Sequence, residues 1–299
     1  MNICKNEFNG ILPKKDRIIV IGDLHADYKK TVHIFLSLKL IDNDYNWIAE
    51  PQNTIVIQLG DQLDGGGRNI QETYGELNLI NFMEIIHKKA LKKGGGVYSL
   101  IGNHEIMNLI GDFSYSSKKD INSQGGILGR KKLFSPGNNF FNKMSCTHNV
   151  IMKVGNMVFV HAGILPEHIT ENNKDNFILK INHLMKLFLR GKKNLNDPEI
   201  QNYFLNKNSM IWNRKYGKED VSCENIELVN NALNVGHMIV GHSIQPNINQ
   251  KCSNKLWRID VGMSDAFEND YDTNYEVLEI LNDGVPCIEN NYKPFRILT

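Results

Sequence analysis

The fold of this chain is decided by one stretch, Gln58-Leu59-Gly60-Asp61-Gln62-Leu63-Asp64-Gly65-Gly66-Gly67-Arg68. The apolar, β-branched run Ile55-Val56-Ile57 precedes it and predicts a buried strand that ends at Asp61. Because α/β sheets bind ligands at the carboxyl ends of their strands, Asp61 and Asp64 are expected at such an edge. The three glycines after Asp64 predict a flexible turn.

Two similar segments flank this strand. Arg17–Asp23 is another buried strand that ends in Gly-Asp, and Val97–Ile101 is a third, followed by Gly102-Asn103-His104-Glu105. Helical periodicity fills the intervals, first after an N-cap at Asp27 and again over about 74–92. The order β-α-β-α-β predicts a parallel sheet with right-handed crossovers.

The second half of the chain has a different pattern. Residues 112–149 are polar and glycine-rich, which predicts an irregular region with short helical pieces near the mouth of the site. A hairpin is expected at Gly155-Asn156, and a helical insertion at about 172–207 has an apolar stripe that we interpret as packing. Late strands at 256–261 and 275–280, without long helices between them, predict a second, mixed or antiparallel sheet packed on the first.

Composition limits the class of protein. The chain has 299 residues, of which 41% are hydrophobic and 22% charged, and a net charge of +1. These values predict one soluble globular domain over residues 1–299 and give no sign of nucleic-acid or membrane binding. The five cysteines form no Cys-x-x-Cys pair, so we expect neither a disulfide framework nor a thiolate zinc site. With no apolar signal core or membrane span, the expected location is the reducing cytoplasm.

Polar residues with oxygen or imidazole donors follow the predicted strands. Each of these residues alone could be an ordinary turn, cap or core residue. A purely structural role does not explain why five predicted strands all end in such residues. Oxygen and nitrogen donors without a thiol favour a site for manganese, iron, zinc or cobalt over a structural zinc site. The residues are Asp23, His25, Asp61, Asp64, Asn103, His104, His161 and His242.

The same segments resemble the five motifs of the calcineurin-like metallophosphatases. The third motif, Gly102-Asn103-His104-Glu105, is typical of phosphoprotein phosphatases, and the segments 133–137 and 257–264 are similar to the Shewanella-like protein phosphatases. The other four motifs are Gly22–Ala26, Gly60–Gly65, Val160–Gly163 and Val240–His242. The resemblance spans about residues 17–285 and implies a four-layer α/β/β/α sandwich of two mixed sheets.

The resemblance also implies roles for these residues. It assigns one metal to Asp23, His25 and Asp61, and a second to Asp61, Asn103, His161 and His242. A hydroxide that bridges the two divalent ions would attack phosphorus directly, while His104, oriented by Asp64, protonates the leaving oxygen. The implied enzyme is a phosphomonoesterase, and its expected substrates are proteins phosphorylated on serine or threonine.

Two positions depart from the family pattern. Ala26 stands where a glycine is usual, and Gly65 stands where the family has an arginine that binds the phosphate. We hypothesise that Arg68 reaches back across the glycine turn to replace this arginine; the alternative is that Arg68 faces solvent. Arg214 is the expected second phosphate ligand, and Arg130 is a weaker candidate.

Two other functions stay open from the sequence. One is hydrolysis of a small molecule such as a dinucleotide polyphosphate, which the shape of the site around the insertion would decide. The other is a phosphoprotein-binding protein that has lost catalysis because its phosphate clamp is incomplete at Gly65. The complete set of predicted ligands and the His104–Asp64 pair argue against this loss.

Overall fold

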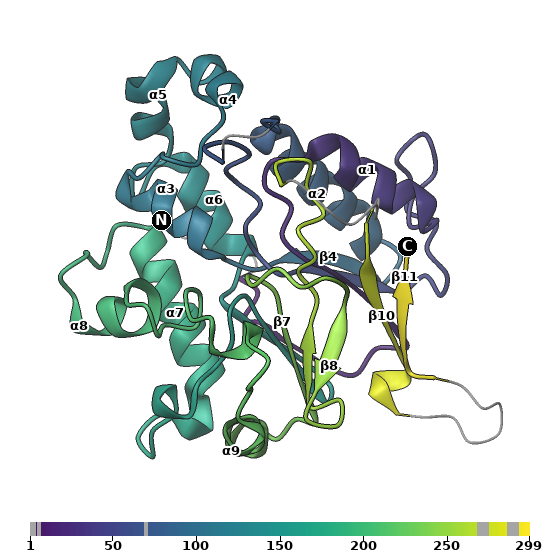
Figure 1. Ribbon diagram of the computed structural model, residues 1–299. Coiled ribbons are helices and arrows are strands. Elements are labelled where there is room, and N and C mark those ends of the chain that lie inside the picture. Colours follow the sequence, from purple (N-terminus) through teal and green to yellow (C-terminus); the bar gives the residue numbers. More distant parts are fainter. Residues whose placement is uncertain (1–3, 5–6, 69–70, 268–274, 286–292) are drawn as a thin grey trace.

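The computed structural model describes residues 1–299 except 1–3, 5–6, 69–70, 268–274 and 286–292. Two mixed β-sheets pack against each other, and helices cover their outer faces (Figure 1). The first sheet is covered by α1 (Tyr28–Ser37) and α2 (Glu76–Leu91), and the second by α7 (Phe177–Leu189) and α9 (Cys223–Leu233). This arrangement confirms the predicted four-layer α/β/β/α fold.

The first sheet has the strand order β11-β10-β2-β3-β4. Its strands β2 (Arg17–Ile21), β3 (Ile55–Gln58) and β4 (Gly96–Ser99) are parallel, with α1 and α2 as crossover helices, as predicted. All of β3 is buried, which explains its unbroken apolar run. Asp27 caps α1 by accepting a hydrogen bond of 3.0 Å from the backbone N–H of Lys30.

One late strand lies in a different sheet from the one predicted. β10 (Val277–Leu281) pairs antiparallel with β2, and β11 (Phe295–Leu298) pairs with the other edge of β10. The prediction that the late strands build the second sheet is therefore wrong for residues 275–280. Every residue of β10 is buried, so the local sequence pattern does not show which of the two sheets this strand joins.

The second sheet has the strand order β1-β5-β6-β7-β9-β8. Its strands β5 and β6 form the predicted hairpin around Gly155-Asn156, and β6, β7 and β9 are parallel. In β6, Phe159 faces the core between the sheets and Val158 faces the outer helices, so both faces of this strand are covered. The bounds are Ile11–Leu12 (β1), Ile151–Val154 (β5), Met157–Val160 (β6), His237–Val240 (β7), Asn249–Lys251 (β8) and Leu256–Arg258 (β9).

Residues 112–149 are more helical than predicted. Ser117 and Asn138 cap two of the three short helices there through their side-chain oxygens. Such short helices show too little apolar periodicity to be recognised in a polar, glycine-rich sequence. The predicted insertion is helical, and the apolar stripe of α7 is buried, as expected. The remaining helices are Asn103–Ile110 (α3), Lys118–Ser123 (α4), Gly126–Leu133 (α5), Asn139–Thr147 (α6) and Pro198–Ile200 (α8), with helical turns at Pro166–His168, Lys174–Asn176, Gln201–Leu205, Lys215–Gly217 and Asn282–Gly284.

Four cysteines form disulfides, Cys4–Cys146 and Cys223–Cys252. The prediction that the chain has no disulfide framework is therefore wrong. The partners lie 142 and 29 residues apart in sequence, so their pairing depends on tertiary proximity, which the cysteine spacing does not reveal. The fifth cysteine, Cys287, lies outside the described residues.

Within the described part of the chain, none of the helices combines the length and the apolar character that crossing a membrane requires.

Candidate metal centre and active site

The carboxyl ends of strands from both sheets meet in one buried cluster. Parallel strands end at a common edge, and the two packed sheets bring their edges together. The structure therefore gathers the residues that the sequence pattern placed at strand ends. They are Asp23 and His25 after β2, Asp61 and Asp64 after β3, Asn103 and His104 after β4, His161 after β6 and His242 after β7.

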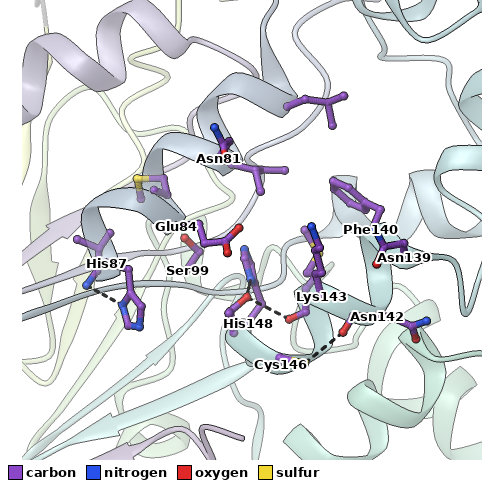
Figure 2. A pocket seen from close by; sticks show the side chains of 16 residues that line it. Asn81, Glu84, His87, Ser99, Asn139, Phe140, Asn142, Lys143, Cys146 and His148 are labelled. Atoms are coloured by element: carbon purple, nitrogen blue, oxygen red, sulfur yellow. Dashed lines mark hydrogen bonds between the residues drawn. The ribbon is translucent and has the colours of Figure 1, made fainter. Parts of the chain in front are cut away.

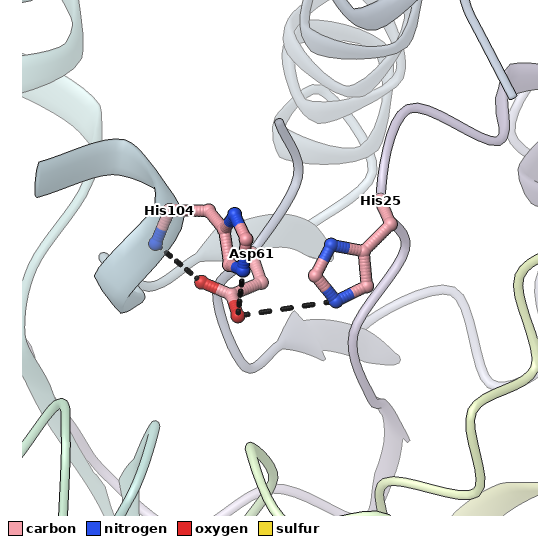
Figure 3. A group of neighbouring side chains, drawn as sticks. All are labelled: His25, Asp61 and His104. Atoms are coloured by element: carbon pink, nitrogen blue, oxygen red, sulfur yellow. Dashed lines mark hydrogen bonds and ion pairs between the residues drawn. The ribbon is translucent and has the colours of Figure 1, made fainter. Parts of the chain in front are cut away.

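Asp61 lies at the centre of this cluster (Figure 3). Its Oδ2 atom is 3.3 Å from His161 Nε2 and 4.0 Å from the Nε2 atoms of both His25 and His104. Its Oδ1 atom accepts a hydrogen bond of 2.9 Å from the backbone N–H of His104. One carboxylate oxygen is thus fixed by the backbone, while the other faces imidazole nitrogens on two sides.

Beside this carboxylate, one group of donors comprises Asn103, His161 and His242. His161 Nε2 lies 3.0 Å from Asn103 Oδ1 and 3.2 Å from His242 Nδ1. The other nitrogen of each imidazole donates to a backbone carbonyl, His161 Nδ1 to Leu59 (2.8 Å) and His242 Nε2 to Trp212 (3.1 Å). These bonds orient a lone pair of each ring into the cluster, so the donor set fits a divalent metal ion.

A second group of donors lies where Asp23 and His25 approach Asp61. Burial and the neighbouring Asp260 carboxylate raise the pKa of Asp23 well above its usual value. A divalent cation would offset the repulsion among these buried carboxylates. Asp260 also lines the cavity of the site; it lies two residues beyond the end of β9, and the sequence analysis missed it because it fell inside the strand predicted over 256–261.

The backbone of the cluster is strained, and Glu105 holds it in place. Four site residues have positive φ angles between 42° and 69°, a left-handed conformation that costs about 1–2 kcal/mol for a residue with a side chain. These residues are His25, Asp61, Asp64 and His242. The Glu105 carboxylate accepts hydrogen bonds from the backbone N–H groups of Asp61 (2.9 Å), Gln62 (2.8 Å) and Gly102 (2.7 Å), which ties the loop after β3 to the start of α3.

His104 and Asp64 form the predicted pair. Asp64 Oδ2 lies 2.9 Å from His104 Nδ1 and accepts a second hydrogen bond of 2.9 Å from Asn108. Asp64 Oδ1 accepts from the Ser116 hydroxyl (2.7 Å) and from Arg130 (3.1 Å). Burial lowers the pKa of His104, but the neighbouring carboxylates outweigh it and raise that pKa above its usual value. Asn108 was detectable from its spacing of four residues on the same helix, whereas Ser116 and Arg130 have no such signal.

The glycine turn after Asp64 is tightly packed. A Cβ atom on Gly65 would lie 2.2 Å from Thr73 Oγ1, and one on Gly66 would lie 2.8 Å from the Cα atom of Ser117. Gly65 and Gly66 are also buried. The prediction of a flexible turn is therefore wrong, because these glycines are required for close backbone approach. Position 65 has no room for the arginine that the family carries there.

Arg68 emerges from this turn and points back into the site. Its Nη1 atom donates to two carbonyls of its own turn, at 2.9 and 3.0 Å. Its Nη2 atom lies 3.1 Å from His25 Nδ1 and 3.5 Å from His104 Nε2. The guanidinium carbon lies 5.0 Å from the ring centroid of Tyr115 and 4.6 Å from that of Phe267. Arg68 is thus held beside the metal-competent residues, and the alternative of a solvent-facing side chain does not apply.

A cavity of about 550 Å³ opens over the cluster. Arg68 and Arg214 both line it, and Arg214 Nη1 donates to the backbone carbonyl of His242 (3.0 Å). Arg130 is instead fully buried behind Asp64, so it is not placed to contact a phosphate in this cavity. The cavity is also lined by Tyr115, Lys218, Ser243, Ile244 and Phe267.

A second cavity, of about 520 Å³, lies between α2 and α6 (Figure 2). Glu84 and Phe140 belong to the two helices that face each other across it. Among the described residues that line this cavity, none is a predicted site residue. It reaches the site only indirectly, because His148 Nε2 donates to the side chain of Gln62 (2.9 Å), the residue after Asp61.

Comparisons with known proteins agree on the family. A family model described as calcineurin-like phosphoesterase matches residues 16–246. Shewanella-like protein phosphatase 2 of Arabidopsis thaliana is 30% identical, over 93% of this chain and 78% of the relative. The uncharacterized protein R398 of Acanthamoeba polyphaga mimivirus is 33% identical, over 73% of this chain and 98% of the relative.

The fold recurs among solved structures. The crystal structure of a cold-active protein-tyrosine phosphatase of a psychrophilic Shewanella species matches with a TM-score of 0.78 at 23% identity, over 95% of this chain and 80% of that chain. The two-sheet fold and the buried cluster of histidines and carboxylates agree with the family match. The chain therefore belongs to the calcineurin-like phosphoesterase family and is a metal-dependent phosphoester hydrolase.

Proposed function

We propose that this chain is a dimetal phosphomonoesterase that removes phosphate from phosphorylated proteins. The observation that carries this proposal is the position of Asp61, whose Oδ2 atom faces His25 at 4.0 Å and His161 at 3.3 Å. A carboxylate between two groups of donors is suited to be the shared ligand of two adjacent ions.

Each ion would be held by residues of this chain. The first site would comprise Asp23, His25 and Asp61, and the second Asp61, Asn103, His161 and His242. In the structure, donor atoms of Asp61 lie close to those of His25 and His104 on one side and of His161 and His242 on the other. Their oxygen and nitrogen donors suit manganese, iron or zinc. Bound there, divalent ions would lower the pKa of a coordinated water toward neutrality and would neutralise charge on the phosphate oxygens.

His104 would act as the general acid. Asp64 holds its Nδ1 atom at 2.9 Å, and its Nε2 atom faces the cavity beside Asp61 and Arg68. As the bond between phosphorus and the leaving oxygen breaks, its electron pair stays on that oxygen, and Nε2 donates the proton. General acids contribute roughly 10²–10⁴-fold to the rate. The contribution is largest for the alkoxide of serine or threonine, which is a poor leaving group.

Arg68 and Arg214 would bind the phosphate from two sides of the cavity. A guanidinium presents parallel N–H donors that match two oxygens of one phosphate. Arg68 takes the role of the arginine that is absent at position 65, and the packed glycine turn directs it there. Since two arginines line the cavity, a phosphoprotein-binding protein without a phosphate clamp is the weaker alternative.

Serine and threonine phosphoproteins are the substrates that the sequence predicts. A second candidate is phosphotyrosine, and it is favoured by the aromatic rings of Tyr115 and Phe267 at the cavity, which offer a surface for an aryl leaving group. A dinucleotide polyphosphate is the third candidate substrate, and it is included in the assays.

One set of assays tests this function. Turnover is measured with added manganese, iron or zinc on a phosphoserine peptide, a phosphotyrosine peptide, p-nitrophenyl phosphate, bis-p-nitrophenyl phosphate and diadenosine tetraphosphate. We expect hydrolysis of the monoesters and near-complete loss of it in Asp61→Asn, the control variant. Activity that survives in Asp61→Asn would refute the dimetal assignment, and a preference for the dinucleotide would refute the phosphoprotein substrate.

A further inference from the structure

Arg130 is the largest fully buried side chain of those that the structure describes. Its guanidinium lies on the core side of Asp64, opposite the cavity, and the ring of Phe134 covers it at 4.6 Å. Burial of an unpaired guanidinium costs several kcal/mol, so its partners decide whether it stabilises or destabilises the fold. The proposed catalytic steps assign it no role.

The guanidinium orients two groups that touch the His104–Asp64 pair. Its Nη2 atom donates to Asp64 Oδ1 at 3.1 Å. Its Nε and Nη2 atoms both donate to Asn108 Oδ1, at 3.0 and 2.7 Å. Because the amide oxygen of Asn108 faces Arg130, its Nδ2 atom must face Asp64, to which it donates at 2.9 Å. Arg130 therefore fixes the carboxylate directly and also through Asn108.

Glu76 anchors the guanidinium itself. Its carboxylate pairs with Arg130 Nη1 and lies 3.2 Å from Nη2. Gln124 bridges the same two groups, accepting from Arg130 Nη1 at 2.8 Å and donating to Glu76 at 2.6 Å. The guanidinium thus connects α2, α3 and α5 to the loop after β3. These contacts restrict the Arg130 side chain to one orientation. The Asp64 carboxylate that it binds is restricted in the same way.

We propose that Arg130 is a positioning residue for protonation of the leaving group, an inference that rests on the proposed function. It sets the orientation of Asp64 and, through Asp64, the direction of the His104 ring. Arg130 touches neither phosphate nor metal ligand, so its effect is confined to the step in which His104 acts. A displacement of about 1 Å at a reacting group costs on the order of 10²-fold in rate.

The inference separates substrates by their leaving groups. An alkoxide requires protonation as it leaves, whereas p-nitrophenolate leaves readily without a proton. Misalignment of His104 therefore slows hydrolysis of a phosphoserine peptide and spares p-nitrophenyl phosphate. A variant that only perturbs the fold or phosphate binding slows both substrates together.

The test combines Arg130→Met with Glu76→Gln in the metal-loaded full chain, so that one buried cation and one buried anion are removed together. Glu76→Gln alone is the matched control, because the glutamine amide oxygen can still accept from Arg130 and the contacts of Arg130 to Asp64 and Asn108 stay in place. For the double variant we expect kcat on the peptide to fall about 100-fold. On p-nitrophenyl phosphate we expect a fall of less than about 3-fold, with KM unchanged on both substrates. The control is expected to lose at most about 3-fold on either substrate.

Two further variants keep the inference testable if the double variant folds poorly. Arg130→Lys keeps the charge but cannot contact Asp64 and Asn108 together, so we expect a selective loss of about 10-fold on the peptide. In a His104→Asn background, the double change is expected to cost no further activity, because both act on one step.

Equal losses on the two substrates, no loss on the peptide, or an additional loss in the His104→Asn background would each overturn the inference. If the wild-type chain hydrolyses neither monoester, the proposed function fails, and the inference fails with it. If the wild-type chain is active and the Arg130 variants lose the same activity on both substrates, the proposed function stands. Only the positioning role of Arg130 is then refuted.

Discussion

Two arginines lie on opposite sides of the His104–Asp64 pair, and their surroundings differ. On the cavity side, Arg68 lies between the aromatic rings of Tyr115 and Phe267. On the core side, Arg130 is fully buried and paired with carboxylates. Arg68 uses Nη1 on its own turn and keeps Nη2 at the cavity beside His25, whereas Arg130 donates to protein side chains from Nε, Nη1 and Nη2.

The comparison shows that residue type alone does not determine the role of an arginine. Both arginines were candidates for phosphate binding, and only burial and partners separate them. Aromatic rings orient a cation without consuming its hydrogen-bond donors, whereas carboxylates consume them. On the cavity side a guanidinium can therefore meet a ligand, and on the core side it holds the Asp64 carboxylate that pairs with His104.

The largest expected effect is on stability, and it is confined to the core side. Arg130→Met leaves the carboxylates of Asp64 and Glu76 buried without their cation, so we expect the free energy of unfolding to fall by about 3–5 kcal/mol. Arg68→Met, the matched control on the cavity side, is expected to cost less than about 1 kcal/mol. Urea denaturation of both variants measures the difference, and equal losses would remove the distinction between the two sides.

The second effect concerns a buried histidine on the other side of Asp61 from the cavity of the site, and it is measured through pH. Burial lowers the pKa of His148 from its usual 6.5 to about 4, and its ring donates to Gln62 beside Asp61. The unfolded chain thus binds this proton near pH 6.5 and the folded protein only near pH 4. The stability that depends on neutral His148 is therefore complete above pH 6.5 and declines by about 3 kcal/mol as the pH falls to about 4.

Unfolding measured between pH 7 and pH 4 checks this dependence. His148→Gln is the comparison variant, since its amide can also donate to Gln62 but does not titrate. We expect a smaller decline of stability with acid in this variant. The same pH slope in both proteins would show that His148 does not contribute.

The third effect is kinetic and belongs to the cavity side. If Arg68 binds phosphate as proposed, Arg68→Ala removes a charge-assisted contact worth about 1.5–3 kcal/mol, so kcat/KM should fall roughly 10–150-fold, with a higher KM and a lower kcat. Arg68→Lys keeps the charge and should recover part of the loss. Steady-state kinetics on p-nitrophenyl phosphate measures both variants. Unchanged kinetics in Arg68→Ala would end the idea that Arg68 replaces the arginine absent at position 65.

The smallest expected effect tests how the Tyr115 ring holds the Arg68 side chain in the cavity. Tyr115→Leu removes a cation–π contact of about 0.5–1 kcal/mol, which corresponds to a rise in KM of about 2–5-fold. Tyr115→Phe retains the ring and is expected to behave as the wild type. An equal rise in KM in the two variants would instead assign the role to the hydroxyl group of Tyr115, which both substitutions remove.

The sequence predicted the parts of the site that follow from strand order. Asp61, His161 and their partners lie at strand ends, and packed sheets bring such ends together, so local pattern was sufficient. Of the two positions that the sequence left open for Arg68, the structure shows the one beside the site, and tight packing of Gly65 and Gly66, not a flexible turn, directs it there.

The rest of the site depends on contacts between segments far apart in sequence. Arg130 meets Asp64 across 66 residues, and Ser116 meets it across 52, with no local signal at either end. The sheet that β10 joins and the pairing of the cysteines are of the same kind. Tertiary packing decides each of these features, and a local sequence pattern does not predict it.

The place of β10 in the first sheet has a consequence for synthesis. β2 is made early and pairs with β3 soon afterwards, but its other edge is paired by β10, about 260 residues later. Until the ribosome has released that segment, one edge of the central sheet stays open, and an open edge is a template for aggregation. The nascent chain therefore depends on β10 to close the sheet whose strand β2 leads to Asp23 and His25.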